Sequence, residues 1–385
     1  MIIELNKKLG FYGILWYINN AWNEVSTIRK KDPRYKLWKK RNDERKFKRK
    51  NKSKITKKRA DKRRLTEKTN HISPTVFTVP NIFSIIKNPE ETISFLNDII
   101  RHVENVRKIV KRKSNTNIAK LFSINMDNTK EITGDALMYL LTIIKNTRGN
   151  KFLPINWIGN FPKDEKMKKF LQNSGYLKYM KTSKQNLVQT NEHIQIQIGQ
   201  GYECKVGNQV IDIRQEIIDF TCQKLNKNKI QINFLMTMLT EMITNITDHA
   251  YDEENLFEHS WYIFVENTAN KISYTFMDNG LGIPTTIKKN KFEKFIGKFD
   301  LDKEYKYIEA GVSGLEKRSK TGLIERGNGL PSIYEQYTSD KISKLTIISN
   351  KAYFEKENSR DLENSLNGTI FYWEIEKEAN VQYGN

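Results

Sequence analysis

Apolar and polar positions alternate with two different periods along this chain, which predicts both strands and helices. Strict alternation in residues 193–199 (HIQIQIG) is typical of a strand with one buried face. Apolar residues instead recur every three to four positions in residues 91–113 and again in 230–250, which indicates amphipathic helices. We therefore expect an α/β protein.

Residues 81–190 follow a strand, helix, strand, helix order, which predicts a small α/β domain with a parallel pair of strands. Gly175 is placed to end the last of these helices. The expected strands are 120–126 (KLFSINM) and 154–162 (PINWIGNFP), and the expected helices are 133–146 and 164–177.

Residues 191–385 carry a longer unit of strands and helices. After the strand at 193–199, we expect a strand pair joined by a tight turn at Thr268–Asn270 and a loop-rich stretch at 283–326. The other expected elements are helices near 213–226 and 230–250, strands 261–267, 271–278, 344–350 and 368–376, and a helix beginning after GNGL.

Two further regions precede these units. Residues 1–26 are aromatic and apolar, and we expect a short helix that packs on another surface. Residues 27–80 form a basic arm that ends in a linker or an extended entry into folded structure, marked by Pro74 and Pro80. The expected regions are therefore 1–26, 27–80, 81–190 and 191–385.

The positive charge is concentrated in the arm. The whole chain has a net charge of +21, and the segment from Arg29 to Lys68 holds about 22 Lys and Arg against about 5 acidic residues. Interleaved aromatic residues such as Trp38 suit phosphate neutralisation with base stacking, so we expect residues 27–68 to bind nucleic acid, RNA or DNA. An anionic membrane surface, an acidic protein partner and a solvated tail are the alternatives.

The cysteines and the apolar runs indicate a cytoplasmic protein. Cys204 and Cys222 give neither a disulfide framework nor a metal-ligand spacing. The longest apolar run, Leu9–Ile18, is about half of the roughly 20 residues that a membrane span needs. No small-residue cleavage site follows it, so we expect neither a transmembrane segment nor export.

A stripe of polar residues marks the helix expected at 230–250. Glu241, Asn245 and His249 are spaced one helical turn apart, which places a carboxylate, an amide and an imidazole on one face. Apolar residues occupy the other positions and are expected to face a core. Alone, the stripe is also compatible with an ordinary solvated helix face.

Two glycine-rich stretches follow further along. An apolar strand ends in Asp278 and continues as Gly280 and Gly282, so a carboxylate precedes backbone that a ligand can approach closely. Gly327 and Gly329 precede a helix whose N-terminal N–H groups suit an anion. Taken singly, the first is also a turn signal and the second a helix cap.

In combination and in this order, the three segments resemble the GHKL superfamily of ATP-binding domains, which includes gyrase, Hsp90, histidine kinases and MutL. The resemblance covers residues 190–377. It implies a Bergerat-type α/β sandwich, a mixed sheet with helices on one face. The stretch LTEMITNITDHAYDE is most similar to the anti-sigma-factor serine kinases, although Ile246 replaces their usual small residue.

The resemblance implies a role for each matched residue. Asn245 would give its amide oxygen to Mg²⁺, and Glu241 would deprotonate the attacking water or hydroxyl. Asp278 would accept a hydrogen bond from the adenine amine, and His249 would either bind a phosphate or cap the local structure. The other positions implied to contact ATP are Gly280, Gly282, Lys320, Arg326, Gly327, Asn328, Gly329 and Thr369. For Lys320 and Arg326, a solvated basic loop is the alternative to an ATP lid.

Three functions fit these expectations. The first is an Mg-ATP-dependent ATPase whose lid closure regulates contact with a protein partner. The others are a serine/threonine protein kinase of the anti-sigma type and an ATP-sensing binding module with little turnover. Residues 81–190 faintly resemble a STAS-like domain, with an unrelated α/β spacer as the alternative, and the aromatic N-terminus suggests a homo-oligomer.

Overall fold

The computed structural model describes most of the chain beyond the basic arm. The described residues are 74–112, 120–147, 155–180, 192–206, 209–249, 259–289, 302–314 and 329–378. Residues from Pro74 onwards form one compact unit. The expected N-terminal helix and basic arm, up to Ser73, lie outside the described residues.

The described chain is a mixed α/β structure with parallel and antiparallel sheets. The largest sheet has the strand order β11-β12-β10-β9-β6-β7-β8 and its neighbouring strands pair antiparallel. A second sheet, β1-β3-β5, is parallel, and β2 and β4 form a short parallel pair. The expected parallel strands on either side of a helix are confirmed by β3, α5 and β5.

The first half of the described chain forms what we call the N-terminal lobe, which contains both parallel sheets. Its helix α6 is capped by Asp164, whose carboxylate accepts the N–H of Met167, and Gly175 adopts a φ of +85° directly after this helix, as expected of a stop residue. Its elements are β1 (Thr75–Thr78), β2 (Ile82–Phe83), α4 (Pro89–Arg112), β3 (Lys120–Asn125), β4 (Glu131–Ile132), α5 (Gly134–Thr147), β5 (Ile155–Gly159), α6 (Glu165–Asn173) and α7 (Tyr176–Tyr179).

The second half forms the seven-stranded sheet and the helices on one of its faces. Helix α8 begins at the N-cap Asp212 and ends at Asn226, which adopts a left-handed φ of 53°. The elements are β6 (His193–Gln200), β7 (Glu203–Val206), β8 (Gln209–Ile211), α8 (Ile213–Leu225), α9 (Lys229–Ile232), α10 (Phe234–His249), β9 (Trp261–Asn267), β10 (Lys271–Asp278), α11 (Ile283–Lys289), α12 (Tyr305–Val312), α13 (Gly329–Thr338), β11 (Lys344–Phe354) and β12 (Arg360–Glu376).

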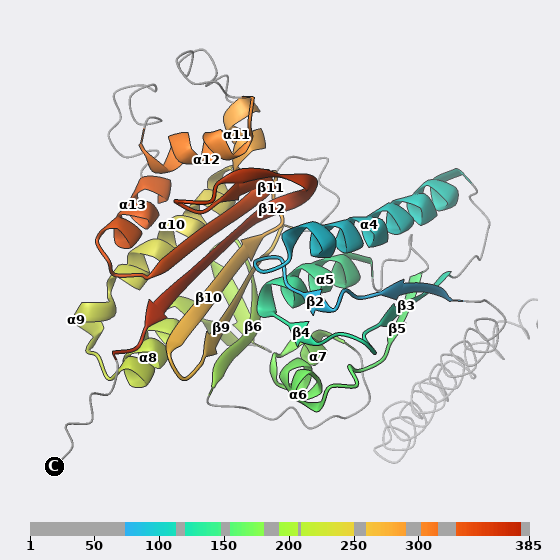
Figure 1. Ribbon diagram of the computed structural model, residues 1–385, viewed down its shortest axis with the longest axis horizontal. Coiled ribbons are helices and arrows are strands. Elements are labelled where there is room, and N and C mark those ends of the chain that lie inside the picture. Colours follow the sequence, from blue (N-terminus) through green and yellow to red (C-terminus); the bar gives the residue numbers. More distant parts are fainter. Residues whose placement is uncertain are drawn as a thin grey trace, which may run out of the picture. The chain divides into compact units, whose positions relative to one another are not determined.

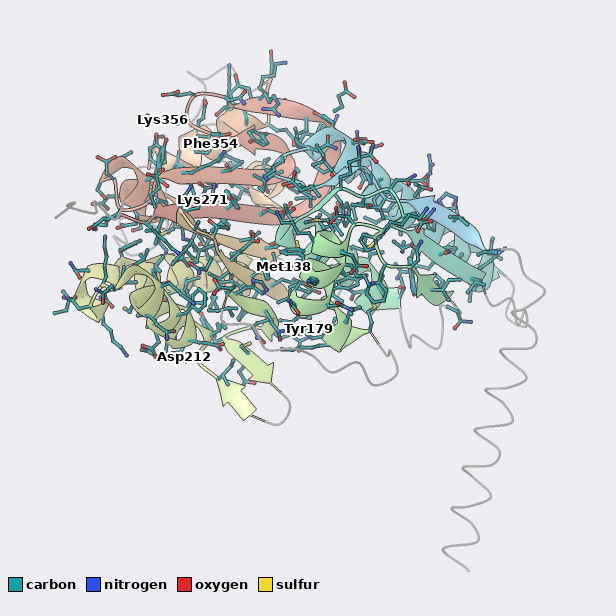
Figure 2. All side chains as sticks on the ribbon, turned by 60° about the horizontal axis from the view of Figure 1, so that its bottom comes forward. Met138, Tyr179, Asp212, Lys271, Phe354 and Lys356 are labelled. Carbon is teal, nitrogen blue, oxygen red and sulfur yellow. The ribbon has the colours of Figure 1, made fainter. Side chains whose placement is uncertain are left out.

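Each face of the seven-stranded sheet has its own core. Helices α8, α10 and α13 pack on one face (Figure 1). Met242 and Ile246 of α10 belong to the same core cluster as Phe276 and Phe371 of the sheet. The N-terminal lobe packs on the other face, where residues of α4 and α5 join Phe264, Met277 and other sheet residues in one cluster. Met138 of α5, which is fully buried, lies among the side chains of this second core (Figure 2). The segments expected as two domains therefore share a core.

Some elements differ from the expectations. The stretch 283–326, expected to be rich in loops, contains α11 and α12, which are too short to give a clear helical period in the sequence. Strands β11 and β12 extend well beyond the expected 344–350 and 368–376 through a hairpin rich in charged residues, where no apolar alternation marks a strand. Among the described residues, no helix is long and apolar enough to cross a membrane.

Candidate nucleotide site

The polar stripe of α10 lies where the sequence places it. Glu241 and Asn245 are half-buried on this helix. The apolar residues between and beside them are buried against the sheet, namely Met238, Leu239, Met242, Ile243 and Ile246. His249 is the last residue of the helix, and its side chain lies outside the description. The expected division of α10 into a core face and a polar stripe is confirmed for the described side chains.

The start of α13 lies directly against this stripe. A β-carbon built on Gly329, the first residue of α13, would be 2.8 Å from Asn245 Nδ2 and 3.0 Å from Glu241 Oε2. Only a residue without a side chain permits this approach while the two polar side chains keep their positions. Two segments far apart in the sequence, the stripe and the second glycine stretch, thus meet.

Asp278 belongs to a row of residues that crosses four strands of the large sheet. In register, Ser349 of β11 is opposite Thr369 of β12, which is opposite Asp278 of β10, which in turn is opposite Trp261 of β9. Side chains two apart along a strand share a face. Because Phe276 packs in the core beneath α10, Asp278 points to the same face of the sheet as α10.

The carboxyl group of Asp278 is almost fully buried. Its exposed fraction is 6%, and its Oδ1 accepts the N–H of Gly280 at 2.7 Å. Burial raises the pKa of Asp278 from 3.8 to about 6, while hydrogen bonds from Gly280 and Thr369 act in the opposite direction. An ionised carboxylate accepts about four hydrogen bonds, so beside those from Gly280 and Thr369 the Asp278 carboxylate can accept one more from a ligand.

The loop after Asp278 is anchored by Asn350, which no pattern in the sequence marks as a site residue. Gly282 has a φ of +85°, and a β-carbon there would lie 2.5 Å from Asn350 Oδ1. The Asn350 side chain accepts from the Thr285 hydroxyl at 3.0 Å and donates to the carbonyl of Leu281 at 3.0 Å. The glycine is thus required by this close approach within the protein itself.

Ser349 and Gly368 also form part of this region without having been identified from the sequence. The Ser349 hydroxyl accepts the N–H of Ile283 at 2.8 Å and lies 3.0 Å from the carbonyl oxygen of Gly368. Gly368 has a φ of +98°, and a β-carbon there would lie 2.1 Å from the carbonyl oxygen of Asp278. In the sequence, the position of Gly368 between Asn367 and Thr369, directly before an apolar strand, is the one feature that indicates a role for it.

The predicted residues fall into two described groups. Glu241, Asn245 and Gly329 come together at α10 and α13, and the residues around the end of β10 come together as a second group, consisting of Asp278, Gly280, Gly282 and Thr369. Both groups lie on the α10 face of the large sheet. The remaining predicted positions, Lys320, Arg326, Gly327 and Asn328, lie outside the described residues.

Other features of the described residues were compared with the predicted site residues. In the ranges that the structure describes, no three His, Cys, Asp or Glu side chains form a metal-binding group. A cavity of about 490 Å³ lies beside β1 and α4 and includes none of the predicted site residues. No protein-family model and no curated protein matches the chain.

Proposed function

We propose that this chain binds Mg-ATP in a GHKL-type site and hydrolyses it. The contact of Gly329 with Glu241 and Asn245 carries the proposal. It brings the start of a helix, where free N–H groups favour phosphate, beside a carboxylate and an amide. A helix face that was merely solvated would need no glycine in this place.

The residues fit a nucleotide with its divalent ion. Gly329 has no side chain that would displace Asn245 and Glu241 at the start of α13, and Asn245 offers an oxygen ligand of the kind that Mg²⁺ prefers. When bound, Mg²⁺ would neutralise phosphate charge. Because one amide is a sparse ligand set, the phosphates and water would complete the coordination.

Each described residue would have a distinct task. The carboxylate of Glu241 would orient a water molecule and take its proton. The buried carboxylate of Asp278 would accept from the purine amine, and Thr369, opposite it in register, would line the same end of the site. The backbone after Asp278 would shape the wall, since Asn350 fixes its course.

The sheet order supports a Bergerat-type sandwich as the fold of residues 191–385. Helices α8, α10 and α13 share a core on one face of an extended sheet, and the two groups of site residues lie on that face. The N-terminal lobe covers the opposite face. Its parallel β1-β3-β5 sheet is compatible with the STAS-like expectation, which stays a prediction.

The alternatives use the same residues in another way. In a serine/threonine kinase, Glu241 would deprotonate a protein hydroxyl in place of water, and the sequence around Asn245 favours this candidate. In an ATP sensor, binding would occur with little turnover. Radiolabelled ATP incubated with and without candidate protein substrates separates free phosphate from labelled protein. Glu241→Gln, which keeps the size of the side chain, should end either reaction while nucleotide still binds.

The basic arm, residues 27–68, would deliver the ATPase to nucleic acid, and a lid containing Lys320 and Arg326 would close over ATP and change a contact with a protein partner. Closure requires that ATP binds one conformation better than the other. We also propose a cytoplasmic setting, and a homo-oligomer as one arrangement to test by light scattering with and without ATP.

A further inference from the structure

The strand segment that leads to Thr369 is held by the N-terminal lobe. The hydroxyl of Tyr139, in the middle of α5, accepts the backbone N–H of Asn367 at 3.0 Å. Tyr139 is 1% exposed, and burial raises its pKa above the usual range, so the hydroxyl stays neutral. A buried side chain from one layer thus fixes the backbone of β12 two residues before Thr369.

Further bonds hold the same segment. Asn97 of α4 donates from Nδ2 to the carbonyl of Ser365 at 2.9 Å. Near the start of α4, the carboxylate of Glu90 accepts the N–H of Glu363 at 3.2 Å. Three side chains of the lobe therefore bind alternate residues of one short stretch of β12.

Residues 363–367 of β12 restrict the backbone positions of Gly368 and Thr369, which follow them. Leu366 and Ile370 are fully buried in the same core cluster as Tyr139. Between them, Gly368 approaches the carbonyl oxygen of Asp278 so closely that a β-carbon would lie 2.1 Å from it. The placement of Thr369 opposite Asp278 consequently depends on where the lobe holds Asn367.

We propose that Tyr139 is a positioning residue for the purine end of the nucleotide site, and that the N-terminal lobe sets nucleotide affinity through it. The inference rests on the proposed function. It adds a role for residues of α4 and α5 that lie on the opposite face of the sheet from the nucleotide.

The chain offers a matched control for a purely structural effect. Tyr274 is also fully buried, lies on the same strand as Asp278, and has its hydroxyl 2.7 Å from the Thr221 hydroxyl. Tyr274 faces α8, and within the part of the chain that the structure describes its hydroxyl has no hydrogen bond to the segment before Thr369. Tyr139→Phe and Tyr274→Phe each remove one buried hydroxyl with a hydrogen-bond partner, so their structural costs should be similar.

The experiment measures the dissociation constants of Mg-ATP and Mg-GTP for the full chain by competition against a fluorescent ATP analogue. Tyr139→Phe should weaken ATP binding about five- to tenfold, the equivalent of one neutral hydrogen bond, and narrow the preference for ATP over GTP. Tyr274→Phe should leave both constants within about twofold of wild type. Asn97→Ala, a second variant with a smaller structural cost, should also weaken ATP binding and narrow the preference for ATP over GTP.

The possible outcomes are distinct. ATP binding that is unchanged in both Tyr139→Phe and Asn97→Ala would overturn the inference while leaving the proposed function intact. Equal weakening by Tyr139→Phe and Tyr274→Phe, with an unchanged preference for ATP, would also overturn it, because that is the result of general loosening. Wild type that binds neither nucleotide would overturn the proposed function and this inference together.

Discussion

Gly329 and Asn245 approach so closely that a single added methyl group would lie 2.8 Å from the side-chain nitrogen of the asparagine. The two residues belong to different helices, α10 and α13, and the described residues between these helices form two strands and two further helices. Their contact brings the polar stripe of α10 and the glycine stretch at the start of α13 together. Each pattern is a weak signal alone, but together they form one place where phosphate, a metal ion and water would bind.

The first prediction concerns this contact. Gly329→Ala should weaken Mg-ATP binding at least tenfold, because the new methyl group displaces Asn245 and Glu241. The atoms it meets are the ends of flexible side chains, and alanine favours a helix by up to about 1 kcal/mol, so the free energy of unfolding should barely change. Titration calorimetry and thermal unfolding of the same protein measure the two effects separately.

Gly311→Ala is the control for adding a methyl group to a neighbouring helix. Its β-carbon would meet only a methyl group of Leu330, at 2.9 Å. This variant should keep its affinity for Mg-ATP. Equal losses in both variants would show that the effect comes from helix packing and not from the polar side chains.

The second prediction separates the roles of the polar stripe. Asn245→Ala should weaken ATP binding at least tenfold in Mg²⁺ but hardly at all in EDTA, because only a metal-dependent contact is lost. Glu241→Gln should retain binding in both conditions and lose turnover by at least a hundredfold, as expected for a general base. Losses of binding that are equal with and without Mg²⁺ in Asn245→Ala would argue against a metal ligand.

The third prediction follows from the pKa of Asp278. The folded protein holds this proton up to about pH 6, whereas the unfolded chain releases it near pH 3.8. Stability is therefore lost as the pH rises between these values and stays lower above them, by about 3 kcal/mol for a shift of this size. Asp278→Asn does not titrate, so its stability relative to wild type should rise over this window.

The same substitution should weaken nucleotide binding at neutral pH, because an amide nitrogen replaces one of the two acceptor oxygens. Urea unfolding at pH 4 and pH 7.5 measures how the stability of each protein changes with pH. ATP titration at several pH values measures the loss of nucleotide binding. The ATP phosphates titrate in the same way with both proteins. A midpoint near pH 6 in the plot of ATP affinity against pH, present in wild type alone, would therefore identify Asp278 as the titrating group. A stability difference that is the same at both pH values would contradict the buried, titrating carboxyl group.

These residues also show what the sequence could and could not predict. The strands around Asp278 and the helix carrying Asn245 were predicted because their apolar periods are long and regular. Gly368 and Asn350 were not, because their importance comes from a bulged hairpin whose register local patterns do not define. The N-terminal lobe packs on the sheet through Tyr139. This packing joins segments that are distant in the sequence, so no local motif predicts it.

The fourth prediction concerns the basic arm. Replacing Lys48, Arg49 and Lys50 with Gln should reduce the salt dependence of nucleic-acid binding, lowering the slope of log K against log salt by up to about 2. Replacing three exposed lysines of the folded unit, Lys163, Lys166 and Lys169, controls for net charge. Fluorescence anisotropy with single-stranded RNA and DNA at several salt concentrations measures both. Equal slopes for the two variants would contradict the assignment of the arm.

The most direct test of the central claim is thermal unfolding of the full chain with and without Mg-ATP, in wild type and in Gly329→Ala. A ligand at a hundredfold excess over its dissociation constant stabilises the folded state by about 2.7 kcal/mol, so the Tm of wild type should rise by several degrees. A tenfold loss of affinity in Gly329→Ala would reduce this stabilisation to about 1.4 kcal/mol, so its Tm should rise by no more than about half as much. An unchanged Tm in wild type, or an equal rise in both proteins, would contradict the proposal that α10 and α13 together bind the phosphates of ATP.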